Sequence, residues 1–213
     1  MSSSRTDGLS RVAERLAPAA NEFRNEVVAA ARPAVLRGVA RHWPVVAAAL
    51  RNPHSCLALL VAHATHLPIA VLRADAEEEG RFHYRPGALA LNFVRGEAPL
   101  RAFLGALREH EMRDRPDALV AQGLIAERYF PGFASTHAMP LVPSSAEARL
   151  WIGNAARIAT HNDPVDNLAV VAAGRRRFTL FPPDAEPDLY MGPKEPTPVG
   201  STMSKHSTGS TCW

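Results

Sequence analysis

Apolar residues recur at two spacings along the chain, and the helical spacing dominates the first half. Apolar positions three or four residues apart predict a helix over residues 9–31, which Pro18 divides into two pieces. The same spacing predicts an Ala-rich helix after Trp43-Pro44, a helix over 56–64 capped by Ser55, and an amphipathic helix over 100–110. The first half is therefore expected to contain several helices.

Short apolar runs bounded by turn residues predict strands. They occur at 33–38 and 68–73, in a hairpin formed by 81–84 and 89–94, and in quick succession at 148–152, 157–161, 167–172 and 177–181. The segment 116–148 is rich in Pro and Gly and is expected to be irregular. Helices followed by closely spaced strands predict an α+β fold with a sandwich or jelly roll in its second half.

The length and composition of the chain indicate one domain and argue against several classes of partner. The 213 residues suit one domain, and a net charge of +3 arises from scattered Arg without a basic block, which gives little support for nucleic-acid binding. Cys56 and Cys212 lie far apart, so neither a disulfide framework nor a cysteine zinc site is expected. The N-terminus lacks a signal-peptide pattern, and the apolar run 56–64 is too short to span a bilayer. We expect a cytoplasmic protein without membrane contact.

The pair His161 and Asp163 is the strongest candidate for chemistry. In an extended strand, side chains two residues apart project from the same face, while Asn162 between them points away. An imidazole and a carboxylate side by side are two thirds of the facial arrangement that binds non-haem Fe(II). His-Asn-Asp-Pro is also good turn chemistry, and taken alone it favours a surface turn. Asn167 and the Arg-rich segment that follow shift the interpretation toward an iron site.

Several motifs together resemble a known family. They are Arg32-Pro-Ala-Val-Leu-Arg-Gly38 with His42-Trp43-Pro44, Leu150-Trp-Ile-Gly-Asn154, His161-x-Asp163 with Asn167 and Gly174, Leu180-Phe-Pro-Pro-Asp184, and Tyr190-Met-Gly-Pro193. This combination resembles the cupin-like, Jumonji-C-type Fe(II)/2-oxoglutarate-dependent hydroxylases, in particular the asparaginyl hydroxylases, over about residues 20–200. The resemblance implies N-terminal helices packed on a double-stranded β-helix, the jelly roll of the cupins.

The resemblance also implies roles for single residues. His161 and Asp163 would bind Fe(II), and Arg176 would pair with the distal carboxylate of 2-oxoglutarate, a contact that suits a guanidinium. Strand parity places Arg176 on the same face as Phe178 and Leu180, which are apolar enough to line a barrel. Asn167 would be a polar neighbour of the metal or the co-substrate.

One co-substrate contact departs from the family pattern. The asparaginyl hydroxylase has a co-substrate-binding Thr where this chain has Ile158. Thr160 is the nearest hydroxyl for that role, although strand parity places it opposite the two metal ligands.

Family members continue into a segment that delivers a second histidine ligand, and no such segment follows here. We therefore expect an incomplete cupin-like domain over residues 1–200, which lacks the second half of its barrel, and a disordered tail over 201–213. His206 is the last candidate for the missing ligand. The strand edges left open would favour pairing with another chain, such as a second copy in a homodimer.

Three functions remain open from the sequence. The first is an Fe(II)/2-oxoglutarate-dependent oxygenase that hydroxylates a protein side chain or a small molecule and is impaired by truncation. The second is a non-catalytic remnant or binding module without a working iron site. The third is a metal-independent cupin that binds a sugar or another small molecule. Without the second histidine, the sequence leaves open whether the chain is an enzyme.

Overall fold

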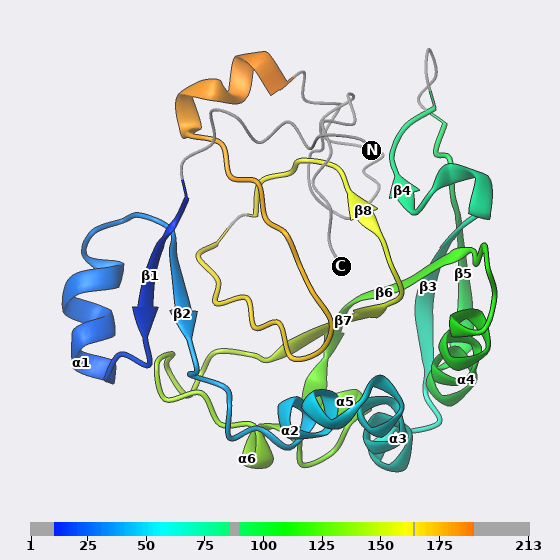
Figure 1. Cartoon of the computed structure of the whole chain (residues 1–213), viewed down its shortest axis with the longest axis horizontal. Coiled ribbons are helices and arrows are strands. Elements are labelled where there is room, and N and C mark those ends of the chain that lie inside the picture. Colours follow the sequence, from blue (N-terminus) through cyan, green and yellow to red (C-terminus); the bar gives the residue numbers. More distant parts are fainter. Residues whose placement is uncertain (1–10, 86–89, 164, 190–213) are drawn as a thin grey trace.

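A four-stranded antiparallel sheet forms the centre of the molecule. The computed structural model describes residues 11–85, 90–163 and 165–189. The sheet has the order β5-β3-β6-β7, and its strands are Val94–Pro99 (β5), Pro68–Ala74 (β3), Ala118–Ile125 (β6) and Arg149–Gly153 (β7) (Figure 1). Two small parallel pairs complete the described strands: Ala13–Leu16 (β1) with Ala34–Arg37 (β2), and Arg81–Phe82 (β4) with Arg157–Ile158 (β8).

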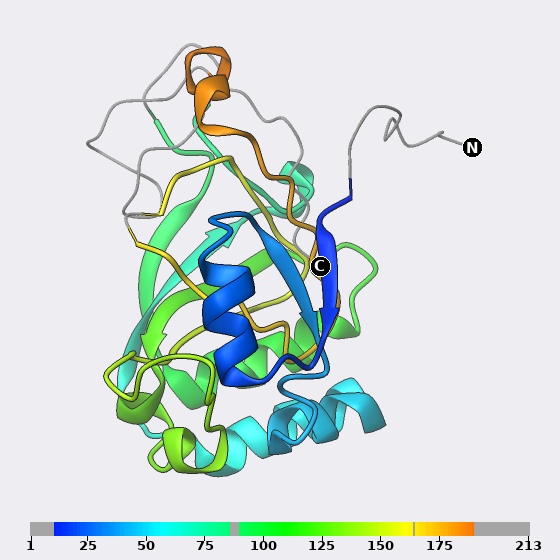
Figure 2. The same ribbon diagram turned by 90° about the vertical axis from the view of Figure 1, so that its left-hand side faces the viewer.

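Helices cover one face of this sheet. They are Pro44–Arg51 (α2), Pro53–His63 (α3), Leu100–Glu111 (α4), Ala126–Tyr129 (α5) and Phe133–Thr136 (α6). Ala20–Glu22 (α1), which continues as a π-helix over Phe23–Val28, lies beside β1 and β2 instead. Short 3-10 turns span Ala76–Glu78 and Pro183–Leu189. Both views show α2, α3 and α5 below the strands (Figures 1 and 2). Within the described ranges, every helix is too short or too polar to cross a membrane.

The two faces of β6 contribute to different hydrophobic clusters. Leu119 and Ala121 point toward the helices and pack with Ile69 of β3 and with the apolar side of α4. Ala118 and Val120 point the other way and pack with Phe82 of β4. Because both faces are covered, the strand is a nearly continuous apolar run rather than an alternating one. The prediction that 116–148 is irregular was therefore wrong for Ala118–Ile125, because period-2 alternation is absent from a strand buried on both sides, whereas residues 137–148 form no helix or strand.

Most of the other elements predicted in the first half are confirmed. The strand at 33–38, the helix after Trp43-Pro44, the strand at 68–73 and the helix at 100–110 are β2, α2, β3 and α4. The helix predicted over 56–64 begins earlier, at Pro53, because Asn52 rather than Ser55 caps it: Asn52 Oδ1 accepts the Ser55 N–H at 2.7 Å.

The start of the chain was predicted incorrectly. Only the part of 9–31 that follows Pro18 is helical, whereas Ala13–Leu16 is a strand paired in parallel with β2. Ala17 has a left-handed φ of 39°, which interrupts a helix at this point. Arg37 also donates two hydrogen bonds to the Glu14 carboxylate, at 2.9 and 2.7 Å, which favours the strand pairing.

The predicted hairpin over 81–84 and 89–94 is only partly formed. Tyr84 and Leu91 make an isolated antiparallel bridge, but the second regular strand begins at Val94. The buried side chain of Asn92 interrupts the ladder, since it accepts the His83 N–H at 2.9 Å and donates to the Arg81 carbonyl at 2.8 Å. The side chain thus adds to the backbone bonds between these segments, such as the one from the Asn92 N–H to the His83 carbonyl at 3.1 Å.

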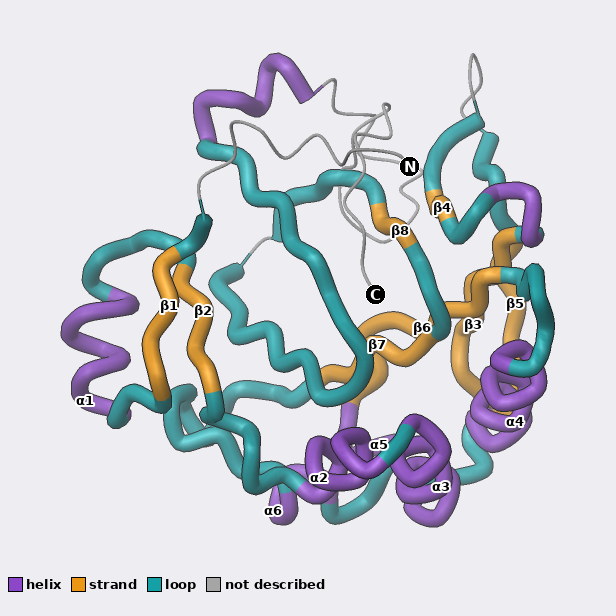
Figure 3. Tube along the Cα trace, in the orientation of Figure 1, coloured by secondary structure: helices purple, strands orange, loops and turns teal. Residues whose placement is uncertain are grey.

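The strands of the second half are the main departure from the predicted jelly roll. Of the four predicted strands, β7 is present, β8 is shortened to Arg157–Ile158, and residues 167–172 and 177–181 form no strand. Figure 3 shows this part of the chain as loop. The strands of the described ranges close no barrel. Residues 190–213, which include Tyr190-Met-Gly-Pro193, His206 and the predicted tail, lie outside the described residues.

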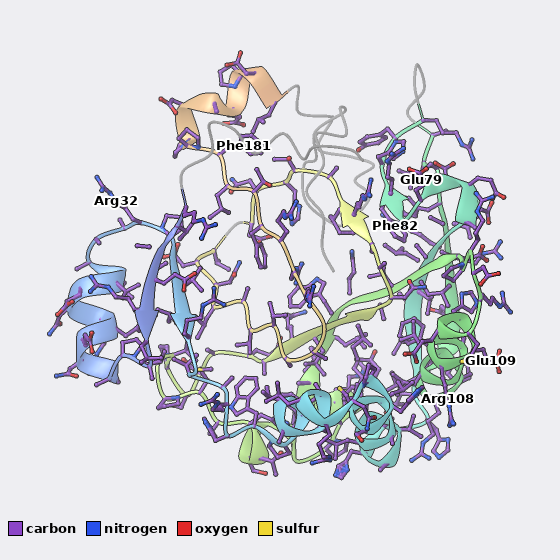
Figure 4. All side chains as sticks on the ribbon, in the orientation of Figure 1. Arg32, Glu79, Phe82, Arg108, Glu109 and Phe181 are labelled. Atoms are coloured by element: carbon purple, nitrogen blue, oxygen red, sulfur yellow. The ribbon has the colours of Figure 1, made fainter. Side chains whose placement is uncertain are left out.

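Aromatic residues are buried near the start of the fold and exposed on the chain that forms no barrel. Phe82 of β4 is fully buried, whereas Phe181, on the chain that returns toward the last 3-10 turn, is 37% exposed (Figure 4). Trp151 of β7 is 55% exposed, which is unusual for a large aromatic residue on a sheet. Apolar surface on this side of the sheet therefore remains in contact with solvent.

Asn154 fixes the end of β7 against the start of β6. Its Oδ1 accepts the Leu119 N–H and its Nδ2 donates to the Asp117 carbonyl, both at 2.8 Å. The approach of the two strands is close, because a Cβ on Gly153 would lie 2.6 Å from the Leu119 carbonyl oxygen. This contact sets the direction in which the chain leaves the sheet toward β8.

Asn154→Ala should lower the free energy of unfolding by about 1–3 kcal/mol, because the N–H of buried Leu119 loses its side-chain acceptor. Urea denaturation would measure the change. Asn162→Ala, at an exposed position, is the matched control and should change stability by less than about 0.5 kcal/mol. Equal stability of the two variants would contradict this role.

His137 acts as the cap of α2 from a distant part of the chain. Its Nε2 accepts the Val45 N–H in the first turn of α2 at 3.3 Å, and its ring stacks on Phe133 with centroids 3.9 Å apart. Nε2 therefore carries the lone pair, and Nδ1–H faces the Phe133 carbonyl at 3.1 Å. Burial lowers the pKa of His137, the hydrogen bond to the Phe133 carbonyl opposes this shift, and the nearby His63 and His42 lower the pKa further. The neutral ring is the form that stabilises the helix.

The unfolding free energy should fall as the pH drops below about 6.5, because the unfolded chain then binds the proton that folded His137 resists. His137→Phe keeps the ring but loses the acceptor, so we expect a loss of about 1 kcal/mol at neutral pH. The same variant should show a shallower loss of stability with acid in urea titrations at several pH values. An unchanged pH dependence would rule out His137 as its source.

Candidate functional site

The candidate site lies on the chain that leaves β8. Arg157 N–H donates to the Gly80 carbonyl at 2.7 Å, which holds β8 against β4. Gly80 has a φ of +77°, and a Cβ there would lie 2.8 Å from the Ala155 carbonyl oxygen, so glycine suits this crossing. Ala156 and Ala159 are buried on either side of β8. The chain is thus fixed to the core as far as Ala159, and His161 and Asp163 come after this last fixed residue.

His161 and Asp163 face each other, as the sequence predicted, although they do not lie in a strand. His161 Nε2 is 3.6 Å from Asp163 Oδ1, and the two side chains are 31% and 49% exposed. The other ring nitrogen, Nδ1, lies 2.9 Å from the Ala159 carbonyl oxygen. Since a carbonyl only accepts, Nδ1 carries a proton and donates it to Ala159. In the neutral ring, the lone pair of Nε2 is then directed toward the carboxylate.

This arrangement brings two electron-rich atoms together. A neutral imidazole nitrogen and a carboxylate oxygen repel each other unless a proton or another cation lies near both of them. A backbone carbonyl that holds Nδ1–H is also the usual support of a metal-binding histidine, because it fixes the tautomer that leaves Nε2 as the ligand. The donor set fits a divalent cation that accepts nitrogen and oxygen ligands, such as Fe(II).

Asn167 supports the acidic half of the pair. Its Nδ2 donates to Asp163 Oδ2 at 2.8 Å, while Oδ1 of the same carboxylate faces His161. The carboxylate is therefore held at one oxygen and presents the other toward the imidazole. The sequence had predicted Asn167 as a polar neighbour of the metal or co-substrate. In the structure it contacts Asp163, which was predicted to bind the metal.

Packing further along the chain fixes the position of Asn167. Val170 and Ala172 pack against the cluster that contains Trp43 and Ala48. From 167 to 173, half-buried residues alternate with exposed ones, as in a strand, although the structure assigns no strand there. The packing of this segment against the cluster around Trp43 was not predicted from the sequence. The apolar residues Leu168, Val170 and Ala172, at every second position, were the signal that could have indicated it.

Thr160 carries an unsatisfied hydroxyl next to the pair. Its Oγ1 is buried and has no hydrogen-bond partner among the described residues. A buried hydroxyl without a partner costs free energy, so such a group calls for an explanation. A polar ligand at this site would provide the missing partner, which agrees with the predicted role of Thr160 but does not establish it.

Arg176 lies in an exposed loop rather than on the predicted barrel strand. The carbon at the centre of its guanidinium is 4.8 Å from the centroid of the Phe178 ring, a cation–π contact. Phe178 and Leu180, predicted to line a barrel beside it, are 49% and 52% exposed. The prediction that Arg176, Phe178 and Leu180 share one face of a barrel strand is therefore wrong, because no strand forms here. The contact of Arg176 with a co-substrate stays a prediction.

The site as described has two of the predicted three metal ligands. Among residues 11–85, 90–163 and 165–189, no group of three His, Cys, Asp or Glu side chains could hold a metal ion. His206, the predicted late candidate, lies outside these ranges. The structure therefore brings together His161, Asp163 and Asn167, with Thr160 adjacent in the chain.

Comparison with known proteins agrees with the motifs. The model of the family described as "Cupin-like domain" matches residues 19–208. The chain belongs to the cupin-like domain family. The predicted cupin-like, Jumonji-C-type membership is thereby confirmed, and this family generally uses Fe(II) and 2-oxoglutarate.

One curated relative of this cupin-like protein comes from Arabidopsis thaliana. Over 66 residues the chain is 39% identical to "Lysine-specific demethylase JMJ31". The similarity covers 30% of this chain and 11% of the demethylase. It supports the family and leaves the activity of the cupin-like protein to be established by experiment.

Asn167→Ala should weaken the binding of Mn(II), a redox-stable probe for the site, by about 10–100-fold, because residues that orient a ligand affect affinity on this scale. Titration followed by the electron paramagnetic resonance of free Mn(II) would measure the change. Asn162→Ala is the control and should bind as the wild type does. Equal affinities of the two variants would show that the bond from Asn167 to Asp163 does not orient a metal ligand.

Proposed function

We propose that this cupin-like protein is an Fe(II)/2-oxoglutarate-dependent oxygenase. The single observation that carries the proposal is the convergence of His161 Nε2 and Asp163 Oδ1 at 3.6 Å with the tautomer that leaves Nε2 as a ligand. These residue types match the metal-binding pair of the family to which the chain belongs. The proposal requires a third ligand from outside the described residues.

Each residue of the site would have a separate task. His161 and Asp163 would hold the metal, and the Ala159 carbonyl and Asn167 would orient these two ligands. Thr160 would donate its unsatisfied hydroxyl to 2-oxoglutarate, and Arg176 would bind the distal carboxylate of that molecule. Fe(II) and 2-oxoglutarate, when bound, would let O2 oxidise 2-oxoglutarate to succinate and CO2 and leave one oxygen atom to oxidise the substrate.

The substrate class we propose is a protein side chain or a small molecule. The curated relative is named for demethylation of lysine, which makes a protein side chain a reasonable first class to test. The imidazole and carboxylate are partly exposed, so a bulky substrate could reach them. Exposure of the site also means that the substrate itself would have to exclude water during the reaction.

The wild-type chain should form succinate only when Fe(II) and 2-oxoglutarate are both supplied. His161→Ala and Asp163→Ala should each reduce succinate to the buffer background, because each removes a direct ligand of the metal. Asn162→Ala should retain the wild-type rate. Succinate can be quantified by mass spectrometry with labelled 2-oxoglutarate, and its release needs no identified substrate.

The same experiment separates the proposal from a non-catalytic binding module. Wild-type succinate no higher than that of the two ligand variants would reject the oxygenase. Thermal stabilisation by 2-oxoglutarate alone, lost in Arg176→Ala, would then identify a protein that binds the keto acid without turning it over.

A further inference from the structure

Asn92 is a polar residue buried in the apolar surroundings of β4. It is only 4% exposed, and its neighbours in the chain, Leu91 and Phe93, pack in the cluster that contains Phe82. The rings of Phe93 and Phe82 meet edge to face, with centroids 5.2 Å apart. A buried amide is costly unless its hydrogen bonds are made, so the partners of this side chain explain why it is there.

The hydrogen bonds that the Asn92 amide makes among the described residues go to β4 and to the turn before it. Its Oδ1 accepts the His83 N–H at 2.9 Å, and its Nδ2 donates to the Arg81 carbonyl at 2.8 Å. Nδ2 also donates to Glu78 Oε2 at 2.8 Å. Exchanging the amide oxygen and nitrogen would place an oxygen against two acceptors, so these partners determine the orientation of the amide.

These bonds lie on the edge of β4 that faces away from β8. Among the described strands, β4 pairs only with β8, in a parallel register. The Arg157 N–H donates to the Gly80 carbonyl at 2.7 Å, so Gly80 directs its backbone groups toward β8. Successive residues of a strand alternate between its edges, so Arg81 and His83 face the other way. The Asn92 amide therefore takes the place of a neighbouring strand.

Strand β8 in turn leads to the candidate metal ligands. It ends at Ile158, and the next residue, Ala159, is buried. The Ala159 carbonyl accepts the proton of His161 Nδ1 at 2.9 Å and so fixes the tautomer that leaves Nε2 facing Asp163. The position of one backbone carbonyl thus decides which nitrogen of His161 is available to a metal.

We propose that Asn92 is a positioning residue for the His161–Asp163 pair. Its amide holds the outer edge of β4, β4 holds β8, and β8 places the Ala159 carbonyl against the imidazole. This role rests on the proposed function, since it treats the pair as metal ligands.

The connection is short enough for one side chain to matter. The β4–β8 ladder contains two residue pairs, and Figure 1 shows it on the side of the sheet away from α2, α3 and α5 (Figure 1). After Ala159, the chain next packs against a buried cluster at Val170. A shift of β4 is therefore passed on to His161.

Asn92→Asp tests this role with a side chain of the same shape. Aspartate keeps the acceptor for the His83 N–H but loses both donors, and it places a second carboxylate beside Glu78. The Ala159 carbonyl should then no longer hold the His161 proton in one position. Proton–nitrogen correlation NMR of the metal-free protein at mildly alkaline pH distinguishes the two tautomers of the ring.

The wild-type protein should carry the His161 proton on Nδ1, whereas Asn92→Asp should show exchange between the two tautomers. The variant should also bind Mn(II) about tenfold more weakly, because residues that orient a ligand affect metal affinity on this scale. Adding Glu78→Gln to Asn92→Asp should recover part of this affinity, since the new amide at position 78 can donate to the carboxylate at position 92.

His137→Phe is the matched control for a general loss of stability, because His137 supports α2 on the helical side of the sheet. It should leave the His161 tautomer and the Mn(II) affinity unchanged, and circular dichroism would show that the variants are folded. A tautomer that is the same in the wild type and in Asn92→Asp would overturn the role of Asn92. A changed tautomer in a chain that forms no succinate would support this role and reject the oxygenase.

Hydrogen exchange of the wild-type chain gives a second test that needs no variant. The amide of His83 is held by Asn92, and the amide of Arg157 is held by β4. If the two edges of β4 depend on each other, both amides should open with similar free energies. A His83 amide that opens about tenfold or more often than that of Arg157 would show that β8 keeps its place without Asn92, which would overturn the proposal.

Discussion

The burial of β6 on both faces is the constraint on which the rest of the structure depends. One face holds the helices through Leu119 and Ala121, and the other holds β4 and β8 through Ala118 and Val120. Burying a Leu, Val or Phe side chain contributes about 1.5–3 kcal/mol, so the two clusters together outweigh any single polar contact in the molecule. Strand β6 therefore positions the helical layer and the chain that leads to the site at the same time.

The site itself depends on fewer contacts than the sheet. The backbone is tied down at Gly80 and Ala159, and the next firm packing is made by Val170 and Ala172 against the cluster around Trp43. His161 and Asp163 lie between these two anchors, and their geometry is set by hydrogen bonds to Ala159 and Asn167. A bound cation would relieve the repulsion between the two facing groups and add a further constraint to this stretch of chain.

Among the described strands, β5 and β7 are the terminal strands of the central sheet, and they differ in chemistry. Strand β5 is exposed at every position except half-buried Ala98. Strand β7 at the other end carries exposed Trp151 on the side away from the helices.

The sequence by itself determined the family, the pairing of His161 with Asp163 and most helices, because short motifs and 3.6-residue periodicity are local properties. It failed at Ala13–Leu16, at Ala118–Ile125 and at the predicted strands 167–172 and 177–181, where pairing or burial by distant residues decides the conformation. Only the tertiary structure decided that Ala159 selects the tautomer of His161 and that Asn167 holds Asp163. Each of these depends on register or on a hydrogen-bond partner, which residue spacing alone does not specify.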